Sequence, residues 1–570
     1  MPRYLVTSAL PYANGPIHFG HVAGAYLPAD VYVRCMRQRG QDVLYVCGSD
    51  EHGAAITIGA EKEGLEYGEY VARWRDDIKH TFDCFGIEFD VWSGTSVCPQ
   101  HAAFSQEFFR RLDENGYLIE QTTEQLYCEH DSMFLPDRYV LGTCPHCGHR
   151  PARGDECPSC GTWLDPLKLG DPACKTCGNT PVVRETTHWY LDLPKLRDEH
   201  IGEWFSDKSW KANVQAYVAQ MLEDLKPRPI TRDLAWGVPV PPELAKGRED
   251  KVLYVWFDAP IGYVSMTAAL FEERGEPEGW RGWWQDADTR LVHFVGKDNI
   301  PFHALVFPSM LYGVKQDYVL PWAVPANEFY NLQGAKFSTS EGRSIPVDAF
   351  FERYDPEAAR FHLLASAPEN SDSEFRWEDF QSTVNASLAG TIGNLVTRVL
   401  RFIDKHFDGK VPPLSEALGP ELDRLLLEEC GDVADPGASI EAFRFRRAAE
   451  ELVGNAAVAN VFVDRQAPWA LRKTDPERAA AVLTTLCDWL ALVARWMAPF
   501  MPGKAQAIWE MLGQTGRVAD SGWPDPPVAG SWRSVTPGQA LGEVEGLFER
   551  IDDARVAEEI AALEARAAQA

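Results

Sequence analysis

The first 53 residues contain the feature that most restricts the fold, a strand, a helix and a second strand in close succession. Residues 3–10 (RYLVTSAL) are an apolar run, residues 22–40 carry apolar side chains at helical spacing, and residues 42–53 open with a second apolar run. Two strands joined by such a helix form a βαβ unit, which predicts a parallel sheet. Because ligands bind beyond the carboxyl ends of parallel strands, a site is expected close to residues 11–21 and 50–52.

Two histidines, His18 and His21, stand at the start of the predicted helix, directly after the turn residues of PYANGP (11–16). A helix N-terminus has free N–H groups and the positive end of the helix dipole, and it therefore favours phosphate. Gly15 and Gly20 allow backbone and ligand to approach closely. The spacing of three residues puts both imidazoles on one side of the first turn, where they can donate hydrogen bonds to a triphosphate and to an attacked α-phosphorus. The alternatives are a metal pair or two solvated histidines.

Three C-x-x-C pairs interrupt the α/β pattern within residues 118–228, a segment rich in turn residues that is expected to be an insertion. Cysteine pairs at this spacing are typical of metal knuckles in a reducing compartment and not of a disulfide framework. The first two pairs are separated by nine residues, and four thiolates from two such knuckles predict a closed tetrahedral Zn²⁺ site with a structural role. Its ligands would be Cys144, Cys147, Cys157 and Cys160.

Strand-like runs resume at residues 251–264 and 289–303, which are expected to complete the sheet after the insertion. From about residue 385 onward, long amphipathic runs separated by Pro and Gly predict a helix bundle, and the acidic, Ala-rich tail 551–570 is expected to be helical as well. The expected fold class is therefore α/β, a Rossmann-type parallel-sheet domain with an inserted zinc-knuckle domain, followed by an all-α helix bundle. The expected divisions are 1–117 and 229–325 for the two halves of the sheet domain, 118–228 for the insertion, 326–384 for a linker domain, 385–535 for the bundle and 536–570 for a tail helix.

The chain is strongly acidic, with 55 Lys and Arg against 84 Asp and Glu and a formal net charge of −29. This charge excludes non-specific attraction to nucleic acid, so any contact with RNA must use local basic patches. The acidity otherwise indicates a solvated surface, as in a salt-adapted organism. The N-terminus has no apolar signal core, and the most apolar late run, residues 479–501, is broken by Asp488 and Arg495. Neither a signal peptide nor a membrane span is expected, and the protein is expected in the cytoplasm.

A second polar stretch, GAKFSTS (334–340), would by itself be read as a solvated surface loop. Together with P-x-x-x-x-x-x-H-x-G-H near the N-terminus, its K-x-S-x-S pattern resembles the two signatures of class I aminoacyl-tRNA synthetases. Further segments are similar to the methionyl-tRNA synthetase family, in order from residue 4 to about residue 550: LPYANGPIHFGH, FLPDRYVLGTCPHCG, LYVWFDAPIGY, GKDNIPFH, NEFYNLQGAKFSTS and QAPW. The resemblance implies that ATP, with Mg²⁺, and methionine form methionyl-adenylate and pyrophosphate. The methionyl group would then pass to the terminal adenosine of initiator or elongator tRNA(Met).

The resemblance also implies which residues hold ATP. His18 and His21 would contact the nucleotide, and the loop would engage its phosphates through Lys336. The family loop is usually K-M-S-K-S, so Thr339 replaces the second lysine, and a cation near the leaving pyrophosphate is either missing or supplied by Arg343 or Mg²⁺. We expect Lys336 to carry the charge of the loop. The other ATP-binding positions implied are Asn14, Gly20, Ser338 and Ser340.

An aromatic-lined slot would bind methionine, whose polarizable sulfur favours the edges of aromatic rings. By the resemblance, the Tyr263 hydroxyl or His303 would lie near the sulfur, and Asp50 would bind the ammonium group. The alternatives are that Trp256 and Tyr263 are ordinary core residues and that Asp50 and Glu51 form a solvated pair. The matching positions are Leu10, Tyr12, Asp50, Trp256, Ala259, Pro260, Tyr263 and His303.

Four further charged residues are expected to support the active site. Arg232 and Asp233, in ITRDLAW, would form an ion pair there or a purely structural salt bridge. Lys297 and Asp298 belong to the matching segment GKDNIPFH.

The third cysteine pair, Cys174 and Cys177, needs partners for a second metal site. Relatives with two zinc ions supply an earlier C-x-x-C before MFLPDRY, where this chain has Cys128 and then Asp131. A second zinc site of Cys128, Asp131 or His130, Cys174 and Cys177 is one prediction, and a degenerate knuckle without metal is the alternative.

The predicted helix bundle would read the anticodon. Asn394 and Arg398, one helical turn apart in GNLVTRVLRF, and Trp469 in QAPW offer hydrogen bonds and a stacking face to unpaired bases. Residues 390–411 hold more Lys and Arg than Asp, the local excess that an acidic RNA-binding protein requires. Bundle packing is the alternative for each of these side chains.

Two other classes of protein are alternatives. A different class I synthetase, such as that for leucine, isoleucine or valine, would carry an editing domain larger than the insertion at 118–228, and a cysteine-specific enzyme would hold zinc in its active site. A non-catalytic zinc-ribbon RNA-binding protein would have no use for both nucleotide signatures. Homodimers of the family often use an extra C-terminal domain, which is not found after LFERIDDARVAEEI, so a monomer is expected, with its tail folded back along the catalytic body.

Overall fold

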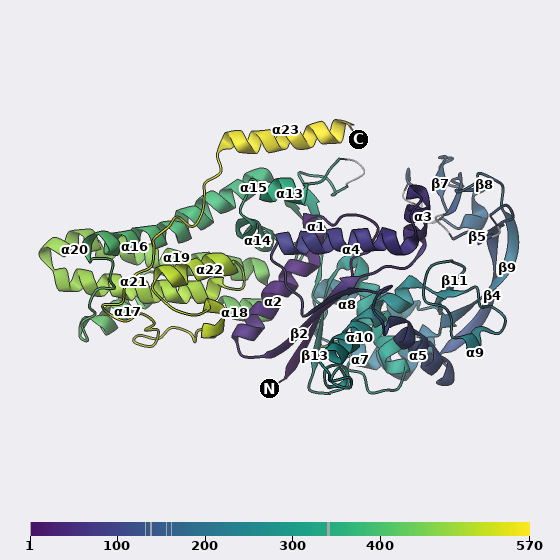
Figure 1. The fold of residues 1–570 in the computed structure, drawn as a ribbon, viewed down its shortest axis with the longest axis horizontal. Coiled ribbons are helices and arrows are strands. Elements are labelled where there is room, and N and C mark those ends of the chain that lie inside the picture. Colours follow the sequence, from purple (N-terminus) through teal and green to yellow (C-terminus); the bar gives the residue numbers. More distant parts are fainter. Residues whose placement is uncertain are drawn as a thin grey trace.

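A five-stranded parallel sheet forms the centre of the molecule in a computed structural model that describes residues 2–569 except 132, 137–138, 155–156, 161, 163 and 339–341 (Figure 1). The strand order is β14-β13-β1-β2-β3, and every neighbouring pair is parallel. Because the order reverses between β1 and β13, a crevice opens at their carboxyl ends. The predicted parallel-sheet domain is confirmed. The strands are β1 (Arg3–Ser8), β2 (Asp42–Ser49), β3 (Val91–Gly94), β13 (Arg290–Gly296) and β14 (Ala326–Asn327).

Helices cover both faces of this sheet because its strands alternate apolar side chains between two cores. Tyr4 and Val6 of β1 belong to one core, shared with α2 and α4, whereas Leu5 belongs to the other, shared with α5 and α10. The helices of this part are α1 (Phe19–His21), α2 (Leu27–Gln38), α3 (Ala54–Glu63), α4 (Tyr67–Cys84), α5 (His101–Glu114), α9 (Pro242–Ala245), α10 (Val255–Glu273), α11 (Arg281–Trp284) and α12 (Phe307–Gly313).

One continuous helical segment, Phe19–Gln38, carries the two histidines at its start and consists of α1, a wider turn at Val22–Tyr26 and α2. Pro28 lacks the N–H that would bond the carbonyl of Gly24 in a regular helix. The side chain of Asn327 donates to that oxygen instead (Nδ2–O 2.9 Å). The segment therefore accommodates a proline, and the end of β14 is held against its first turns.

The segment 251–264, expected as a strand, is mostly helical. Only Val252–Leu253 form a strand, β12, which pairs with β11 (Thr231–Arg232), and α10 begins at Val255. A run that is apolar at nearly every position fits a buried strand as well as a helix that is buried on all sides. Because α10 is buried along most of its length, its sequence has no polar face that would reveal the helical period. The sheet is completed by β13 and β14.

The insertion forms an antiparallel sheet at one end of the molecule, on the right in Figure 1, with strand order β10-β9-β4-β5. A small separate sheet, β7-β6-β8, carries the cysteine knuckles. The elements are β4 (Leu118–Cys128), β5 (Met133–Phe134), β6 (Val140–Thr143), β7 (Ala152–Arg153), β8 (Gly170–Cys174), β9 (Val182–Leu191), α6 (Leu193–Leu196), α7 (Gly202–Ser206), α8 (Ala212–Glu223) and β10 (Arg228–Pro229).

The segment after β14 links the sheet to the helical part of the chain. Its strands β15 (Tyr330–Leu332) and β16 (Ser373–Phe375) are parallel neighbours, with α13 (Val347–Phe351) and α14 (Pro356–Ala365) between them. Residues 377–406 are helical without a break, from α15 (Trp377–Ser382) through a wider-turned stretch into α16 (Asn394–His406). The expected domain boundary between residues 384 and 385 therefore falls inside this continuous helix.

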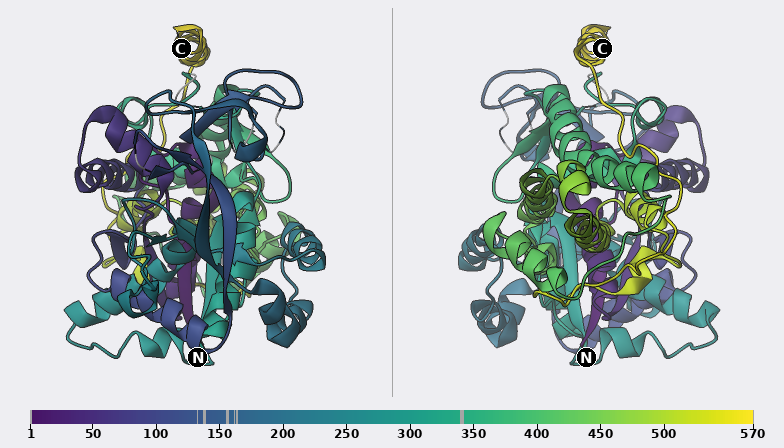
Figure 2. Two further views of the ribbon diagram at one scale, coloured as in Figure 1. Left: turned by 90° about the vertical axis from the view of Figure 1, so that its right-hand side faces the viewer. Right: turned by 90° about the vertical axis from the view of Figure 1, so that its left-hand side faces the viewer.

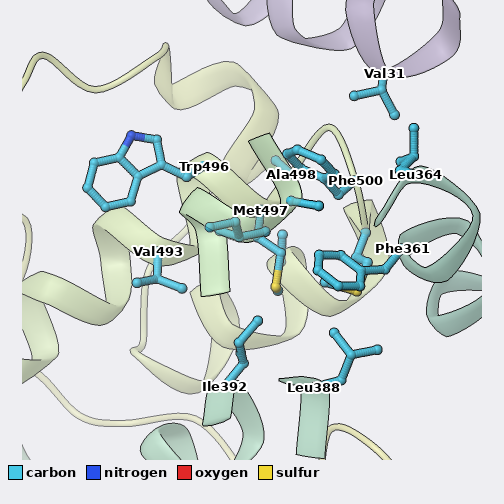
Figure 3. Close-up of a cluster of buried hydrophobic side chains, with 14 of the residues drawn as sticks. Val31, Phe361, Leu364, Leu388, Ile392, Val493, Trp496, Met497, Ala498 and Phe500 are labelled. Carbon is cyan, nitrogen blue, oxygen red and sulfur yellow. The ribbon is translucent and has the colours of Figure 1, made fainter. Parts of the chain in front are cut away.

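The C-terminal part is a helix bundle, as predicted, and it occupies the left of Figure 1. Its further helices are α17 (Leu418–Glu429), α18 (Pro436–Glu441), α19 (Phe445–Gln466), α20 (Pro468–Thr474), α21 (Pro476–Met497) and α22 (Pro502–Met511). Apolar side chains of α2, α14 and α21, among them Val31, Phe361 and Met497, meet in one core at its junction with the sheet domain (Figure 3). Among the described residues, α21 alone is long and apolar enough to cross a membrane, and 94% of its apolar window is buried in this fold.

The last helix, α23 (Asp553–Gln569), stands at the edge of the molecule in both views of Figure 2. It is fixed to the linker segment by ion pairs from Arg353 to Glu558 (2.8 Å) and Glu559 (2.6 Å), and Arg566 donates to the carbonyl of Ser344. The tail is therefore helical, as expected, and it folds back onto the segment that carries the KFSTS sequence.

Candidate functional site

A cavity of about 280 Å³ lies at the crevice between the carboxyl ends of β1 and β13. Ala9, directly after β1, and Gly296, at the end of β13, line it together with both predicted histidines. Gly20 also lines it, and a side chain there would meet the carbonyl of Tyr330 at 2.8 Å, so only glycine allows this approach. Asn14, in contrast, is exposed in the preceding turn and lies outside the cavity lining.

The two histidines are held in one protonation state by the helix start itself. The ring of His18 accepts the N–H of Gly20 at Nδ1 (3.1 Å), and the ring of His21 accepts the N–H of His18 at Nδ1 (3.1 Å). Burial lowers the pKa of His18, which also faces His21, to about 2 and the pKa of His21 to about 4. Both rings are therefore neutral at pH 7 and carry their proton on Nε2. Each presents one N–H donor, which suits phosphate oxygens, and neither is poised as an acid.

The KFSTS loop lies over the histidines. The Phe337 ring stacks on His18 with 4.5 Å between centroids and 10° between planes, and Lys336 lines the cavity with its ammonium 5.5 Å from the Phe329 ring centre. The backbones of Ser338 and Arg343 pair in both directions at 2.9 Å as an antiparallel bridge. Thr339 and the predicted Ser340 lie outside the described residues. Phe337 was not predicted as a site residue, because a single aromatic residue in a polar loop has no distinctive pattern.

At the position predicted for the methionine sulfur, Tyr263 and His303 form a buried hydrogen-bonded pair. The Tyr263 hydroxyl lies 2.8 Å from Nε2 of His303, and Nδ1 of His303 lies 3.1 Å from the carbonyl of Asn299. Burial lowers the pKa of His303 to about 4, so its single proton sits on Nδ1 and bonds that carbonyl. Nε2 is then an acceptor, and the Tyr263 hydroxyl is the donor, with the carbonyl of Ser8 as a second acceptor nearby (3.1 Å). The single hydroxyl proton is thereby used within the protein, and the aromatic ring is the part of Tyr263 that suits a polarizable sulfur.

The other slot residues are brought to the same region by β1 and α10. Leu10 lies against Gly262, where an added methyl group would meet its Cδ1 at 3.2 Å. The Trp256 ring stacks on Phe302 at 3.8 Å and stays 37% exposed, so it is not an ordinary core residue. Tyr12 forms a parallel bridge with Asp50. Ala259 and Pro260 are buried on the same helix as Tyr263.

Asp50 and Glu51 are buried, so the alternative of a solvated pair is wrong. Glu51 is neutralised by Arg75 (2.9 Å), but no Lys or Arg of the described residues pairs with Asp50. Burial and the nearby Asp258 raise the pKa of Asp50 well above its usual range. A carboxylate in this position gains most from a cationic ligand, and the ammonium group of an amino acid provides one.

Behind Asp50 lies a charge network that no sequence pattern indicated. Asp258 Oδ2 is 2.6 Å from Nδ1 of His52 and 3.2 Å from Nε2 of His101, and all three side chains are buried. Burial by itself would raise the pKa of Asp258, but the two histidines hold it below its usual value. The network joins α10, the loop after β2 and α5. Its members are 50 to 200 residues apart along the chain, and only the fold brings them together.

Arg232 and Asp233 do not pair with each other, so the predicted ion pair is wrong. They are neighbours at the end of β11, where successive side chains point to opposite faces. Asp233 contacts Lys251 and His188 instead, whereas Arg232 lies over the ring of Tyr254 at 3.9 Å. Arg232 and Asp233 lie at the two-stranded sheet of β11 and β12, and β12 directly precedes α10 in the chain.

Lys297 and Asp298 follow β13 at the rim of the cavity. Lys297 bridges Glu328 (2.9 Å) and Asp372 (2.8 Å), which ties the rim to the linker segment. Asp298 lines the cavity itself. Of the two, Asp298 is therefore the one that faces a ligand in the cavity.

Both sets of predicted metal ligands converge in the insertion, where each could hold an ion. In the first, Sγ of Cys144 and Cys160 are 3.9 Å apart and Sγ of Cys147 and Cys157 are 3.6 Å apart. Thiolates bound tetrahedrally at 2.3 Å from zinc would be separated by about 3.8 Å, so the four cysteines fit this ion. The amides of Cys144 and Cys157 donate to the carbonyls of His149 (2.9 Å) and Thr162 (3.0 Å), which fixes the two knuckle turns. The four donors lie within 4.8 Å of one another.

The second predicted set, Cys128, Asp131, Cys174 and Cys177, also converges within 4.8 Å. Asp131 Oδ2 is 3.2 Å from the sulfur of Cys128 and 3.1 Å from that of Cys174. A carboxylate in place of a fourth thiolate is an accepted zinc ligand. His130 contacts the other oxygen of Asp131 and is exposed, which favours Asp131 over His130 as the ligand.

The three predicted anticodon residues meet at the far end of the bundle. Arg398 pairs with Asp464 (2.6 Å) and lies 5.1 Å from the ring centre of Trp469. Asn394 contacts Asn460 on α19 (3.4 Å). Trp469 is 42% exposed, so one face of its ring is open to a stacking base.

Comparisons with known proteins agree along the whole chain. Family descriptions match as "tRNA synthetases class I (M)" over residues 4–400 and "Anticodon binding domain of methionyl tRNA ligase" over residues 412–566. A methionine–tRNA ligase from Rubrobacter xylanophilus is 45% identical over 97% of this chain and 96% of its own length. Another from Salinibacter ruber is 43% identical over 100% of this chain and 82% of its own length.

Solved structures agree on the fold. The structure of Mycobacterium tuberculosis methionyl-tRNA synthetase bound by methionyl-adenylate has a TM-score of 0.75 to this chain at 24% identity, covering 96% of this chain and 100% of that one. The parallel sheet with its histidine-bearing helix, the inserted knuckles and the helix bundle together define a class I aminoacyl-tRNA synthetase. With its two family matches and its relatives at 43–45% identity, the chain belongs to the methionyl-tRNA synthetase family.

Proposed function

We propose that this chain is a methionine–tRNA ligase. It activates methionine with ATP, releasing pyrophosphate, and transfers the methionyl group to the 3′-terminal adenosine of initiator and elongator tRNA(Met). The observation that supports this proposal is that two neutral histidine donors, the Asp50 carboxyl and the buried Tyr263–His303 pair all lie near the carboxyl ends of β1, β2 and β13. They would bind the phosphates, the ammonium group and the thioether.

In the activation step the methionine carboxylate attacks the α-phosphorus of ATP, and the protein supplies position and charge. Asp50 holds the ammonium group, and the Tyr263 ring meets the sulfur, so that the carboxylate is directed toward the histidines. The Nε2–H groups of His18 and His21 stabilise the charge that develops on the phosphate oxygens. Lys336 on the loop balances the leaving pyrophosphate, together with the Mg²⁺ that accompanies ATP.

The finer assignments rest on the donor sets and contacts above. Two structural zinc ions would be held by the Cys₄ and Cys₃Asp clusters of the insertion, where closed coordination would stabilise the knuckles. Asn394, Arg398 and Trp469 would read the anticodon. The chain would act as a monomer in the cytoplasm, a location supported by its thirteen free cysteines.

The first experiment is ATP–pyrophosphate exchange with each of the twenty amino acids. Exchange with methionine alone is expected, whereas exchange with another amino acid would keep the mechanism and refute the slot. The same assay tests the loop: Lys336→Ala should reduce the exchange rate at least ~100-fold, as loss of a preorganised charge does, and Lys336→Arg should retain part of it. Unchanged exchange in Lys336→Ala would show that the loop charge resides elsewhere.

A further inference from the structure

A groove of about 810 Å³ lies outside the site described above, where three distant segments of the chain meet residues Glu369 and Asn370. It is bounded by residues 207–211 before α8, residues 322–325 before β14 and residues 442–450 at the start of α19. Its lining includes three carboxylates and five cationic side chains: Lys208, Lys211, Arg444, Arg446 and Arg447. On a chain with a net charge of −29, an excess of cations in one groove is a local reversal of charge.

The arginines of this groove are available to a ligand. Arg444 and Arg446 are exposed, and neither has an ion-pair partner among the described residues. Arg447 pairs with Glu451 on its own helix; the Arg447 side chain is 62% exposed, whereas that of Glu451 is 13% exposed. Lys211, in contrast, donates to the carbonyl of Ala326 (2.7 Å) and to the side chain of Asn327 (3.2 Å).

Aromatic side chains form part of the same groove. Trp322 is 42% exposed, and its carbonyl accepts the indole N–H of Trp210 (2.8 Å). The ring of Phe443 lies 6.4 Å from that of Trp322. Cations follow the phosphates of a nucleic acid strand, and exposed aromatic rings stack on its unpaired bases.

The groove is a neighbour of the cavity that contains the two histidines. Asn331 lines both that cavity and a hollow of about 700 Å³, and Arg446 lines both this hollow and the basic groove. The three hollows therefore lie next to one another on the molecule.

One straight helix also joins the groove to the predicted anticodon residues. Arg446 is fourteen residues before Asn460 on α19, which corresponds to about 21 Å along the helix axis and a rotation of only about 40°. Glu450 and Asp464 repeat this spacing, so one side of α19 runs from the groove to the contacts of Asn394 and Arg398. This side is exposed at its two ends and half-buried at residues 453, 454, 457 and 460. The groove and the predicted anticodon residues therefore lie on the same side of this helix.

We propose that this basic groove docks the phosphate backbone of tRNA between its anticodon and its acceptor end. The inference rests on the proposed function, since it concerns the same substrate. Phosphate contacts fix the register of a nucleic acid without reading its sequence. Here they would orient the tRNA body while the anticodon is read at one end and the acceptor adenosine enters the cavity at the other.

The test is the double variant Arg444→Glu/Arg447→Glu, with aminoacylation of tRNA(Met) measured at 50–200 mM salt. The expected result is a KM for tRNA that rises at least ~10-fold and a slope of log KM against log salt that falls by about two, one for each lost phosphate contact. Methionine-dependent pyrophosphate exchange, which needs no tRNA, should stay within about twofold. Retained exchange also shows that the proposed activation chemistry holds independently of the groove.

The matched control is Lys226→Glu/Arg274→Glu, which changes the net charge equally at exposed positions outside the groove. If the control raises the KM for tRNA as much as the groove variant, only bulk charge is at work and the proposal is overturned. An unchanged KM and salt slope in the groove variant overturns it as well. Should charge reversal impair folding, Arg444→Gln/Arg447→Gln gives the same readouts and about the same change in slope, because it removes the same two phosphate contacts.

Discussion

We predict that the contact between the sheet domain and the helix bundle depends most on the buried guanidinium of Arg360. It lies on α14 with 1% of its side chain exposed and donates to Asp30 on α2 (2.6 Å). It also donates to the carbonyls of Phe85 (2.9 Å), Phe500 (3.0 Å) and Pro499 (3.1 Å). The guanidinium thereby connects α2, the end of α4 and the turn after α21, whose Phe500 is labelled in Figure 3.

The substitution Arg360→Met retains most of the volume and removes every donor. Taking one partner from a buried ion pair costs about 3–5 kcal/mol. Arg34 still pairs with Asp30 (2.8 Å), so the lower end, about 3 kcal/mol, is expected. This is a large share of the 5–15 kcal/mol that stabilises a typical domain. Because the lost bonds cross the junction, the bundle and the sheet domain should also unfold in separate steps.

Urea unfolding, followed by circular dichroism and by tryptophan fluorescence, measures both effects. The double-mutant cycle with Asp30→Asn should return a coupling energy of about 1–3 kcal/mol. Arg376→Met is the matched control, because Arg376 is an exposed arginine of the same linker segment with only a 3.4 Å contact to Glu374, and it should cost less than about 1 kcal/mol. A loss below about 1 kcal/mol for Arg360→Met, with coincident transitions, would refute this account of the junction.

Three further outcomes are expected. Asp258→Asn removes the charged partner of His52 behind Asp50, and it should raise the KM for methionine about tenfold in pyrophosphate exchange while leaving the KM for ATP unchanged; equal changes in both constants would argue against a role in the methionine slot. Metal analysis should find two zinc ions per chain, and Cys157→Ser should lose one of them and lower the melting temperature; one ion in the unaltered protein would contradict the second site. Because the pKa values of His18 and His21 are lowered in the fold, the unfolded chain binds more protons than the folded one between pH 6.5 and about 4. The free energy of unfolding should therefore fall as the pH drops through this window, and His21→Gln should reduce that fall. An acid sensitivity that is the same in His21→Gln would show that His21 stays uncharged for another reason.

The sequence by itself determined the parts of this protein whose chemistry is local. The βαβ start, the histidine pair at a helix N-terminus, the C-x-x-C knuckles and the amphipathic bundle helices each depend on residues close together in the chain, and each leaves a readable spacing. The resemblance between separate signatures then indicated the family and its slot residues. Four cysteines in two tight turns, for example, predict their own convergence.

The tertiary structure decided what depends on residues brought together from afar. α10 was mistaken for a strand because complete burial removes the polar face that marks a helix. Asp233 pairs with Lys251 and His188 and not with Arg232, because neighbouring side chains in a strand point to opposite faces. The network around Asp258, the junction at Arg360 and the groove beside α19 have no pattern in the sequence. Each arises from long-range packing, which places charges together only after the chain has folded.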